Sequence, residues 1–140
     1  MRHLLFLTAF LFLFPGVVFA EQIDSFSSDI TIQVDGAIRI NETIDYDFGV
    51  DERHGIFRII PYIKTNTEGK KFRMNLEPQG VVDEGGVPYR YALTDENGEL
   101  NIKIGDANRT ITGKHTYVIP YTVSGALTYF SDHDELYWNI

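Results

Sequence analysis

Charged side chains that could do chemistry meet apolar strand residues in the stretch 54–61. His54 lies in a polar turn, and Arg58 lies inside the short apolar run that follows it. A histidine near acidic groups can act as a general base or as a pH-sensitive switch, and a guanidinium can bind a carboxylate through two hydrogen bonds. The expected partner of Arg58 is Glu42, which interrupts an otherwise apolar strand face.

The Glu42 and Arg58 pair has two interpretations. In the structural one, Glu42 is buried on the inward face of one strand, satisfies Arg58 from the next strand and fixes how the strands pair. In the functional one, Arg58 recognises the carboxylate of a ligand. We favour the structural pair, because a catalytic site needs a nucleophile or a metal that this stretch does not offer.

A second group of possible ligands is the acidic loop 132–135, Asp-His-Asp-Glu. Together with a distant histidine, the loop would supply nitrogen and oxygen ligands for zinc or a similar divalent metal. The candidates for such a metal site are His54, His115, Asp132, His133 and Asp134. Spacing alone specifies no site, and an acidic loop before a strand is more often a solvated turn. We therefore expect no cofactor and no metal, and we assign no catalytic residue.

Other common chemistry has little support in the sequence. Residues 95–106 carry the acidic spacing of a calcium loop, but Leu100 stands where that loop needs glycine. The chain has no cysteine, no Gly-x-Ser-x-Gly elbow and no glycine-rich phosphate loop. Its tyrosines could stack on sugars, although core packing is the better explanation for Tyr117 and Tyr121.

The elements that must position these groups begin after an expected signal peptide. Residues 1–20 start with a positive charge, continue as an uncharged apolar run and end in small residues. Residues 21–140 are then long enough for one domain with one core. The chain has 12 Lys and Arg against 20 Asp and Glu, which argues against nucleic acid or anionic lipid as a partner and leaves a basic small ligand possible.

Alternating apolar residues predict strands. The strongest signal is a hairpin in which residues 30–34 and 38–48 flank the turn at Asp35-Gly36. A second hairpin turns at Asn97-Gly98. Residues 21–28 show no clear period and are expected to be a polar lead.

Further strands are predicted over residues 56–60, 115–123 and 136–140. Pro120 interrupts the longest of them and indicates a bulge or an edge position. The Gly- and Pro-rich residues 77–88 are typical of a long loop. Many short strands, with no helical period after residue 20, predict a single all-β sandwich that is immunoglobulin-like in general architecture.

Several pieces of the chain form an ordered set, namely Asp35-Gly36, Glu42, residues 54–61, residues 102–105, residues 117–121 and residues 135–139. This set resembles the N-terminal region of a family of predicted bacterial membrane proteins, domain of unknown function 2207. The resemblance implies a signal peptide, then an extracytoplasmic β-rich domain, then membrane helices. It also implies further strands beyond residue 139, so we expect a truncated product or a fragment. The family has no established activity, so no catalytic residue is carried over.

We therefore expect a non-enzymatic binding or interaction domain of a membrane-anchored envelope protein, exported to the periplasmic or extracellular side of the membrane. Its partner would be a protein, peptide or polysaccharide of the envelope, and the missing C-terminal region would supply the membrane contact. One alternative is a metal-dependent or His-assisted envelope hydrolase that uses His54, His115 and the loop 132–135. Another is a solute-sensing domain coupled to membrane helices. Convergence of the histidines and the acidic loop in one pocket would favour the hydrolase.

Overall fold

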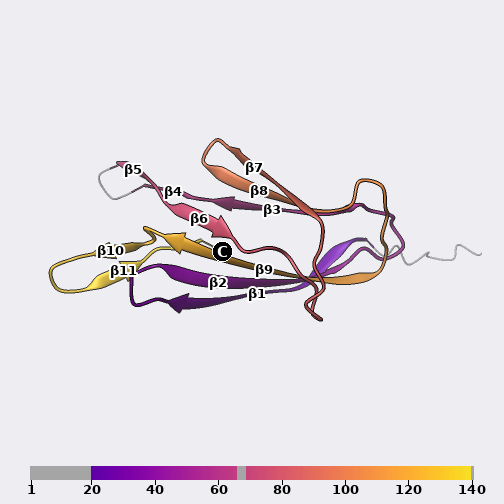
Figure 1. Cartoon of the computed structure of the whole chain (residues 1–140), viewed down its shortest axis with the longest axis horizontal. Coiled ribbons are helices and arrows are strands. Elements are labelled where there is room, and N and C mark those ends of the chain that lie inside the picture. The colour runs from indigo at the N-terminus through magenta and orange to yellow at the C-terminus, as the bar shows by residue number, and fades with distance from the viewer. Residues whose placement is uncertain (1–19, 66–68, 140) are drawn as a thin grey trace, which may run out of the picture.

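The computed structural model describes residues 20–65 and 69–139, which form strands, turns and loops without a helix (Figure 1). All the strand pairs are antiparallel. The all-β class predicted from the sequence is therefore confirmed. The expected signal peptide, residues 1–20, lies outside the described residues except for Ala20, and the end of the strand expected over residues 136–140 lies outside them too.

The strands in chain order are β1 (Gln22–Ile32), β2 (Ile38–Asp47), β3 (Gly55–Pro61), β4 (Ile63–Thr65), β5 (Lys71–Arg73), β6 (Asn75–Pro78), β7 (Tyr91–Glu96), β8 (Glu99–Gly105), β9 (Lys114–Ser124), β10 (Leu127–Tyr129) and β11 (Asp134–Leu136). Four of them form one sheet in the order β1-β2-β9-β6, and three form a second sheet in the order β3-β8-β7. Two short ladders, β4-β5 and β10-β11, extend the same end of the molecule (Figure 1).

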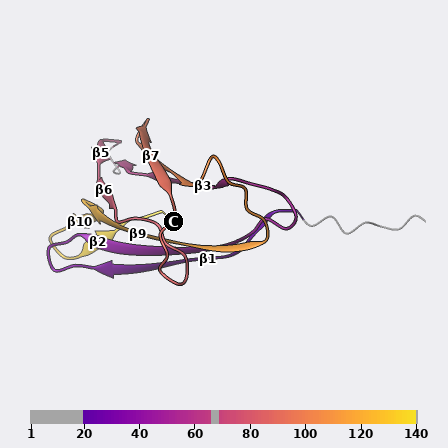
Figure 2. The ribbon, with the colours of Figure 1, turned by 45° about the vertical axis from the view of Figure 1, so that its right-hand side comes forward.

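The two larger sheets lie face to face as the layers of a sandwich, with β1, β2 and β9 below β3 and β7 in both views (Figures 1 and 2). A sheet of four strands against a sheet of three is also the general architecture of an immunoglobulin constant domain. The strand order differs from that of an immunoglobulin domain. Here β9 follows the β7-β8 hairpin in the chain but pairs with β2 in the other sheet.

Alternate residues of both sheets point inward and pack in one core. Its fully buried members come from β2, β3, β8 and β9 and include Ile38, Ile40, Ile60, Ile102, Tyr117, Ile119, Tyr121 and Val123. Burying such a side chain stabilises a fold by about 1.5–3 kcal/mol. Among the described residues, Glu42 is the one charged side chain buried in this core.

Both predicted hairpin turns are confirmed. The amide of Gln33 donates to the carbonyl of Ala37 at 2.8 Å across the first turn, where Gly36 has φ 82°. In the second turn, Asn97 and Gly98 have φ 56° and 85°. Left-handed geometry at both central residues matches the right-handed twist of the flanking strands, which explains the Asn-Gly pair.

Two strand boundaries were predicted wrongly. Residues 21–28, expected to be a polar lead, belong mostly to β1, which pairs with β2 from Gln22 onward. This edge strand is held by its backbone ladder while most of its side chains face solvent, so it needs no apolar period. At the other end, β11 covers Asp134–Leu136, and no strand forms over residues 137–139.

Pro120 lies in β9, which pairs with β2 on one side and β6 on the other, so it does not mark an edge. The register changes opposite it, between the pairs Pro78↔Tyr121 and Val82↔Val118. The irregularity therefore lies in the segment between Pro78 and Val82, which runs beside Pro120. Because this segment forms no regular ladder with β9, the missing N–H of Pro120 removes no regular ladder hydrogen bond.

Candidate functional site

Glu42 and Arg58 meet between the two layers of the sandwich. Glu42 lies in β2 and is 0% exposed, and Arg58 lies in β3 of the other sheet. The Nε of Arg58 donates to Oε2 of Glu42 at 2.7 Å, and Nη2 donates to Oε1 at 2.7 Å. The hydroxyl of Tyr121 in β9 also donates to Oε1, at 2.6 Å. Three donors from two other strands thus surround one buried carboxylate.

The contacts of Arg58 are directed inside the protein. Its Nη1 donates to the carbonyl of Ile59 at 2.7 Å, so all three guanidinium nitrogens donate to protein oxygens. The Phe26 ring covers the guanidinium at 5.6 Å from Cζ. The hydrogen bonds that Arg58 donates to Glu42 raise the pKa of Arg58, and burial, followed by the hydrogen bond to Glu42, raises the pKa of Tyr121. This arrangement leaves Arg58 no free fork for a ligand carboxylate.

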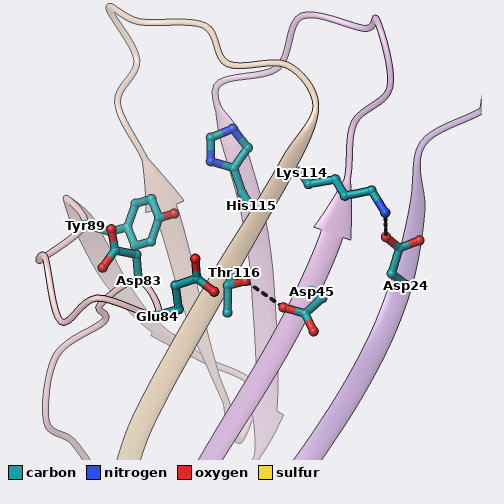
Figure 3. Close-up of a pocket in the computed structure, with 8 residues that line it drawn as sticks. All are labelled: Asp24, Asp45, Asp83, Glu84, Tyr89, Lys114, His115 and Thr116. Atoms are coloured by element: carbon teal, nitrogen blue, oxygen red, sulfur yellow. Dashed lines mark hydrogen bonds and ion pairs between the residues drawn. The ribbon is translucent and has the colours of Figure 1, made fainter.

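A groove lies at the end of the sandwich where β3 and β9 begin (Figure 3). It consists of two adjoining hollows that share Asp83, Tyr89 and His115 as lining residues. The first, which we call the acidic hollow, has a volume of about 480 Å³ and is the one drawn in Figure 3. The second, the tyrosine hollow, has a volume of about 430 Å³ and includes His54 and Tyr117 in its wall. Together they are called the end groove below.

Four carboxylates and one ammonium line the acidic hollow, from Asp24, Asp45, Asp83, Glu84 and Lys114. The ammonium of Lys114 donates to Asp24 at 2.7 Å. Two hydroxyls, first that of Ser25 and then that of Thr116, each donate to Asp45 at 2.6 Å and lower its pKa, so this carboxylate stays ionised.

The remaining two carboxylates belong to the turn after Val82. Oδ1 of Asp83 accepts from the backbone amides of Gly85 and Val87 at 2.9 and 2.8 Å, which shapes the turn. Glu84 has no hydrogen bond or ion pair with the residues that the structure describes, and its carboxylate points into the hollow (Figure 3). The hollow therefore carries excess negative charge.

The tyrosine hollow contains a buried hydroxyl without a partner. Tyr117 is 0% exposed, and its hydroxyl makes no hydrogen bond within the described part of the chain. Its ring packs against that of Tyr89, with centroids 4.8 Å apart and planes 35° apart. Burial raises the pKa of both phenols. An unsatisfied buried hydroxyl costs about 1–3 kcal/mol, so this one needs an explanation.

Two histidines that the sequence singled out line this hollow together. Nδ1 of His54 lies 3.1 Å from the carbonyl oxygens of Asp106 and Arg109, and Nε2 of His115 lies 3.2 Å from that of Thr112. Because a carbonyl oxygen only accepts, these ring nitrogens carry the protons. When the ring carries a single proton, its other nitrogen is an acceptor.

The acidic loop 132–135 lies elsewhere, in the β10-β11 hairpin at the opposite end of the sandwich (Figure 1). There Nδ1 of His133 contacts Asp132 at 2.9 Å, Nε2 contacts Glu135 at 3.4 Å, and the ring stacks on Phe130. Asp134 begins β11 and is exposed. The structure thus does not bring this loop to His54 or His115. No group of three or more His, Asp or Glu side chains within residues 20–65 and 69–139 is placed to hold a metal ion.

Sequence patterns alone do not reveal the other half of the groove. Asp83 and Glu84 fall in the loop predicted over residues 77–88, to which no function was assigned. The available signal was the Asp-Glu-Gly-Gly turn close to a tyrosine, since loops held by a rigid scaffold often carry binding residues.

Sequence comparisons relate the chain to known proteins. A family model, described as the N-terminal domain of predicted membrane proteins (DUF2207), matches residues 22–140. The chain belongs to this family. The resemblance inferred from the sequence is thereby confirmed.

The chain is also similar to the uncharacterized protein YciQ of Escherichia coli strain K12, with 30% identity over 124 residues. The match covers 87% of this chain and 20% of YciQ, so the chain spans about a fifth of the length of this relative. No solved structure matches the chain. Residues 20–65 and 69–139 contain no helix that is long and apolar enough to cross a membrane.

Proposed function

We propose that this DUF2207 domain is a non-enzymatic binding module, which a membrane-anchored parent protein holds on the extracytoplasmic side and which takes a ligand into the end groove. The observation that carries the proposal is the hydroxyl of Tyr117, which is buried in the wall of the groove without a partner. A ligand that bonds to this hydroxyl removes its cost of about 1–3 kcal/mol. Phenylalanine would fill the same space without that cost, so the hydroxyl serves something other than packing.

The location rests on the sequence and the family. Residues 1–20 have the pattern of an export signal, and the family is one of predicted membrane proteins. In the parent, the part beyond this domain supplies the membrane attachment. A soluble peptide or saccharide of the envelope is the kind of ligand that such a domain meets. If ligand binding in the groove is transmitted to the membrane segments, the module is a solute sensor. That function uses the same binding site and adds a signal.

A His-assisted hydrolase is the second candidate, favoured by the convergence of His54 and His115 in the tyrosine hollow. Two observations favour binding instead. Each histidine is bonded to backbone carbonyls, and neither contacts a hydroxyl that it could activate among the described residues. The loop 132–135, which the metal-dependent version requires, lies at the other end of the sandwich.

The test is an NMR titration of the whole chain, purified after export, with three soluble probes: trialanine, N-acetylglucosamine and spermidine. We expect at least one probe to cause saturable amide shifts that concentrate at Glu84, Tyr89, His115 and Tyr117. Shifts that scatter over the surface, or none for any probe, would contradict the proposal. Turnover of a probe that is lost in both His54→Ala and His115→Ala would establish the hydrolase instead.

A further inference from the structure

We infer that the end groove binds a dipolar ligand, a short peptide with free ends, whose ammonium lies in the acidic hollow and whose carboxylate meets Arg109. This inference rests on the proposed binding function and names the ligand class for the same groove. Three features carry it: uncompensated negative charge in one hollow, an unpaired buried hydroxyl in the middle, and a free guanidinium in the other hollow.

The acidic hollow has the properties of an ammonium site. Its one lysine is already paired with Asp24, while Asp45, Asp83 and Glu84 retain their negative charge. The ring of Tyr89 lines the same hollow, and an aromatic ring beside carboxylates attracts an organic cation through its π face. A ligand ammonium can donate to three acceptors at once, which suits converging carboxylates.

The unpaired hydroxyl of Tyr117 distinguishes this groove from an ordinary solvated acidic surface. It is fully buried and lines the tyrosine hollow, next to the Tyr89 ring that both hollows share. A ligand that extends from the acidic hollow past Tyr89 therefore passes the Tyr117 side chain. A peptide group provides what is needed there, because its carbonyl accepts from Tyr117 and its N–H donates to the free nitrogen of His115.

The far side of the tyrosine hollow carries the complementary charge. Arg90 and Arg109 both line it, and Nη1 of Arg90 pairs with Asp106 at 3.1 Å. The guanidinium of Arg109 makes no hydrogen bond or ion pair with the described residues. It is therefore available for a bidentate contact with a carboxylate, the strongest type of hydrogen-bonded recognition for this group.

Size favours a peptide over a single amino acid. The hollows of about 480 and 430 Å³ adjoin, and sites for small organic ligands typically have about 300–1,000 Å³. A free amino acid has its two charges on one carbon atom and cannot place them in separate hollows. A peptide of a few residues separates them and spans the Tyr89 and Tyr117 rings.

The experiment is calorimetric titration at low ionic strength with four probes: trialanine, N-acetyl-trialanine, trialanine amide and alanine. Trialanine should bind about tenfold more tightly than either blocked form, and alanine should bind more weakly still. Glu84→Gln should narrow the difference between trialanine and its N-acetyl form, because Asp45 and Asp83 remain in the acidic hollow. Arg109→Gln should abolish the difference between trialanine and its amide. Glu96→Gln and Arg39→Gln, which change charge outside the groove, should leave all four affinities unchanged.

The possible failures are distinguishable. If the blocked peptides bind in the groove as tightly as trialanine, the dipolar ligand class is wrong and the binding function stands. If alanine binds as tightly as trialanine, the peptide part is wrong. If N-acetylglucosamine or spermidine shifts groove residues while trialanine does not, the ligand class is again overturned. If no probe shifts the groove residues, the inference and the proposed function fail together.

Discussion

Arg58 and Glu42 join the two layers of the sandwich through two hydrogen bonds of 2.7 Å each. The side chain of Glu42 is fully buried and that of Arg58 is 17% exposed, so water screens this pair little. Removing two charges from water is costly, and a pair of this kind contributes less to net stability than its geometry suggests. Removing one partner is a different matter, because the other charge stays buried.

Replacement of Arg58 alone should therefore be far more harmful than replacement of both partners. We expect Arg58→Met to lower the free energy of unfolding by about 3–5 kcal/mol, because it leaves the carboxylate of Glu42 uncompensated. The double variant Glu42→Leu with Arg58→Met should recover most of that loss. Urea unfolding followed by circular dichroism measures both. A double variant no more stable than the single one would show that the ion pair itself stabilises the sandwich.

Two buried tyrosines of β9 should respond oppositely to loss of their hydroxyls. Tyr121→Phe removes a donor to a buried carboxylate and should cost about 1.5–3 kcal/mol. Tyr117→Phe removes a hydroxyl without a partner among the described residues and should leave stability unchanged or raise it. The same urea experiment compares them. A large loss in Tyr117→Phe would mean that its hydroxyl has a structural partner and would remove the main support for a ligand there.

Gly55 and Gly105 face each other across β3 and β8 with φ of 136° and 137°. A Cβ atom on Gly55 would collide with the carbonyl oxygen of Ile104. Gly55→Ala should therefore lower stability by at least about 1 kcal/mol more than Gly80→Ala, where φ is also positive, at 105°, but no atom lies within 4 Å of the added carbon. Comparison of the two thermal unfolding midpoints tests this, and equal midpoints would show that the backbone moves apart at no cost.

The β10-β11 hairpin should lose stability as the pH rises. Hydrogen bonds that the His133 ring donates to Asp132, and then to Glu135, raise the pKa of His133 above its ordinary value of 6.5. The protonated form is therefore favoured in the folded state, and its stabilisation is complete below about pH 6.5 and disappears as the pH rises through the raised pKa. NMR titration of the His133 ring should give a midpoint above 6.5.

The matched control for this hairpin is His133→Asn, which cannot gain a proton. Amide exchange in β10 should accelerate from about pH 6 to about pH 8 beyond the intrinsic rate in the wild type, and not in the variant. A His133 midpoint at or below 6.5 would contradict the account.

Local patterns explain which parts of the fold could be predicted from the sequence. The turns at Asp35-Gly36 and Asn97-Gly98 depend on residues that tolerate positive φ, a property of the turn itself. The position of Glu42 opposite Arg58 follows from strand alternation, since each interrupts an inward-facing apolar row. The edge strand β1 escaped prediction because hydrogen bonds to β2, rather than burial, specify it.

The end groove could not be predicted in the same way. It is built by residues of β1, β2 and β9 and by a turn, which come together only when β9 pairs with β2 and with the segment around Val82. No sequence pattern predicts that the Tyr117 hydroxyl lacks a hydrogen-bond partner or that the Arg109 guanidinium is unpaired. Both depend on which other polar groups the fold brings near. The signals at His54 and His115 were visible, but their expected partner, the loop 132–135, lies in a hairpin at the other end.

The affinity of trialanine for the wild type and for Tyr117→Phe, measured by calorimetry on protein of verified fold, tests the central claim most directly. We predict that the variant is at least as stable as the wild type and binds trialanine about tenfold more weakly, because the ligand loses the buried hydroxyl that it satisfies. Equal affinities for the two proteins would contradict the account, since the Tyr117 hydroxyl would then have no role in binding.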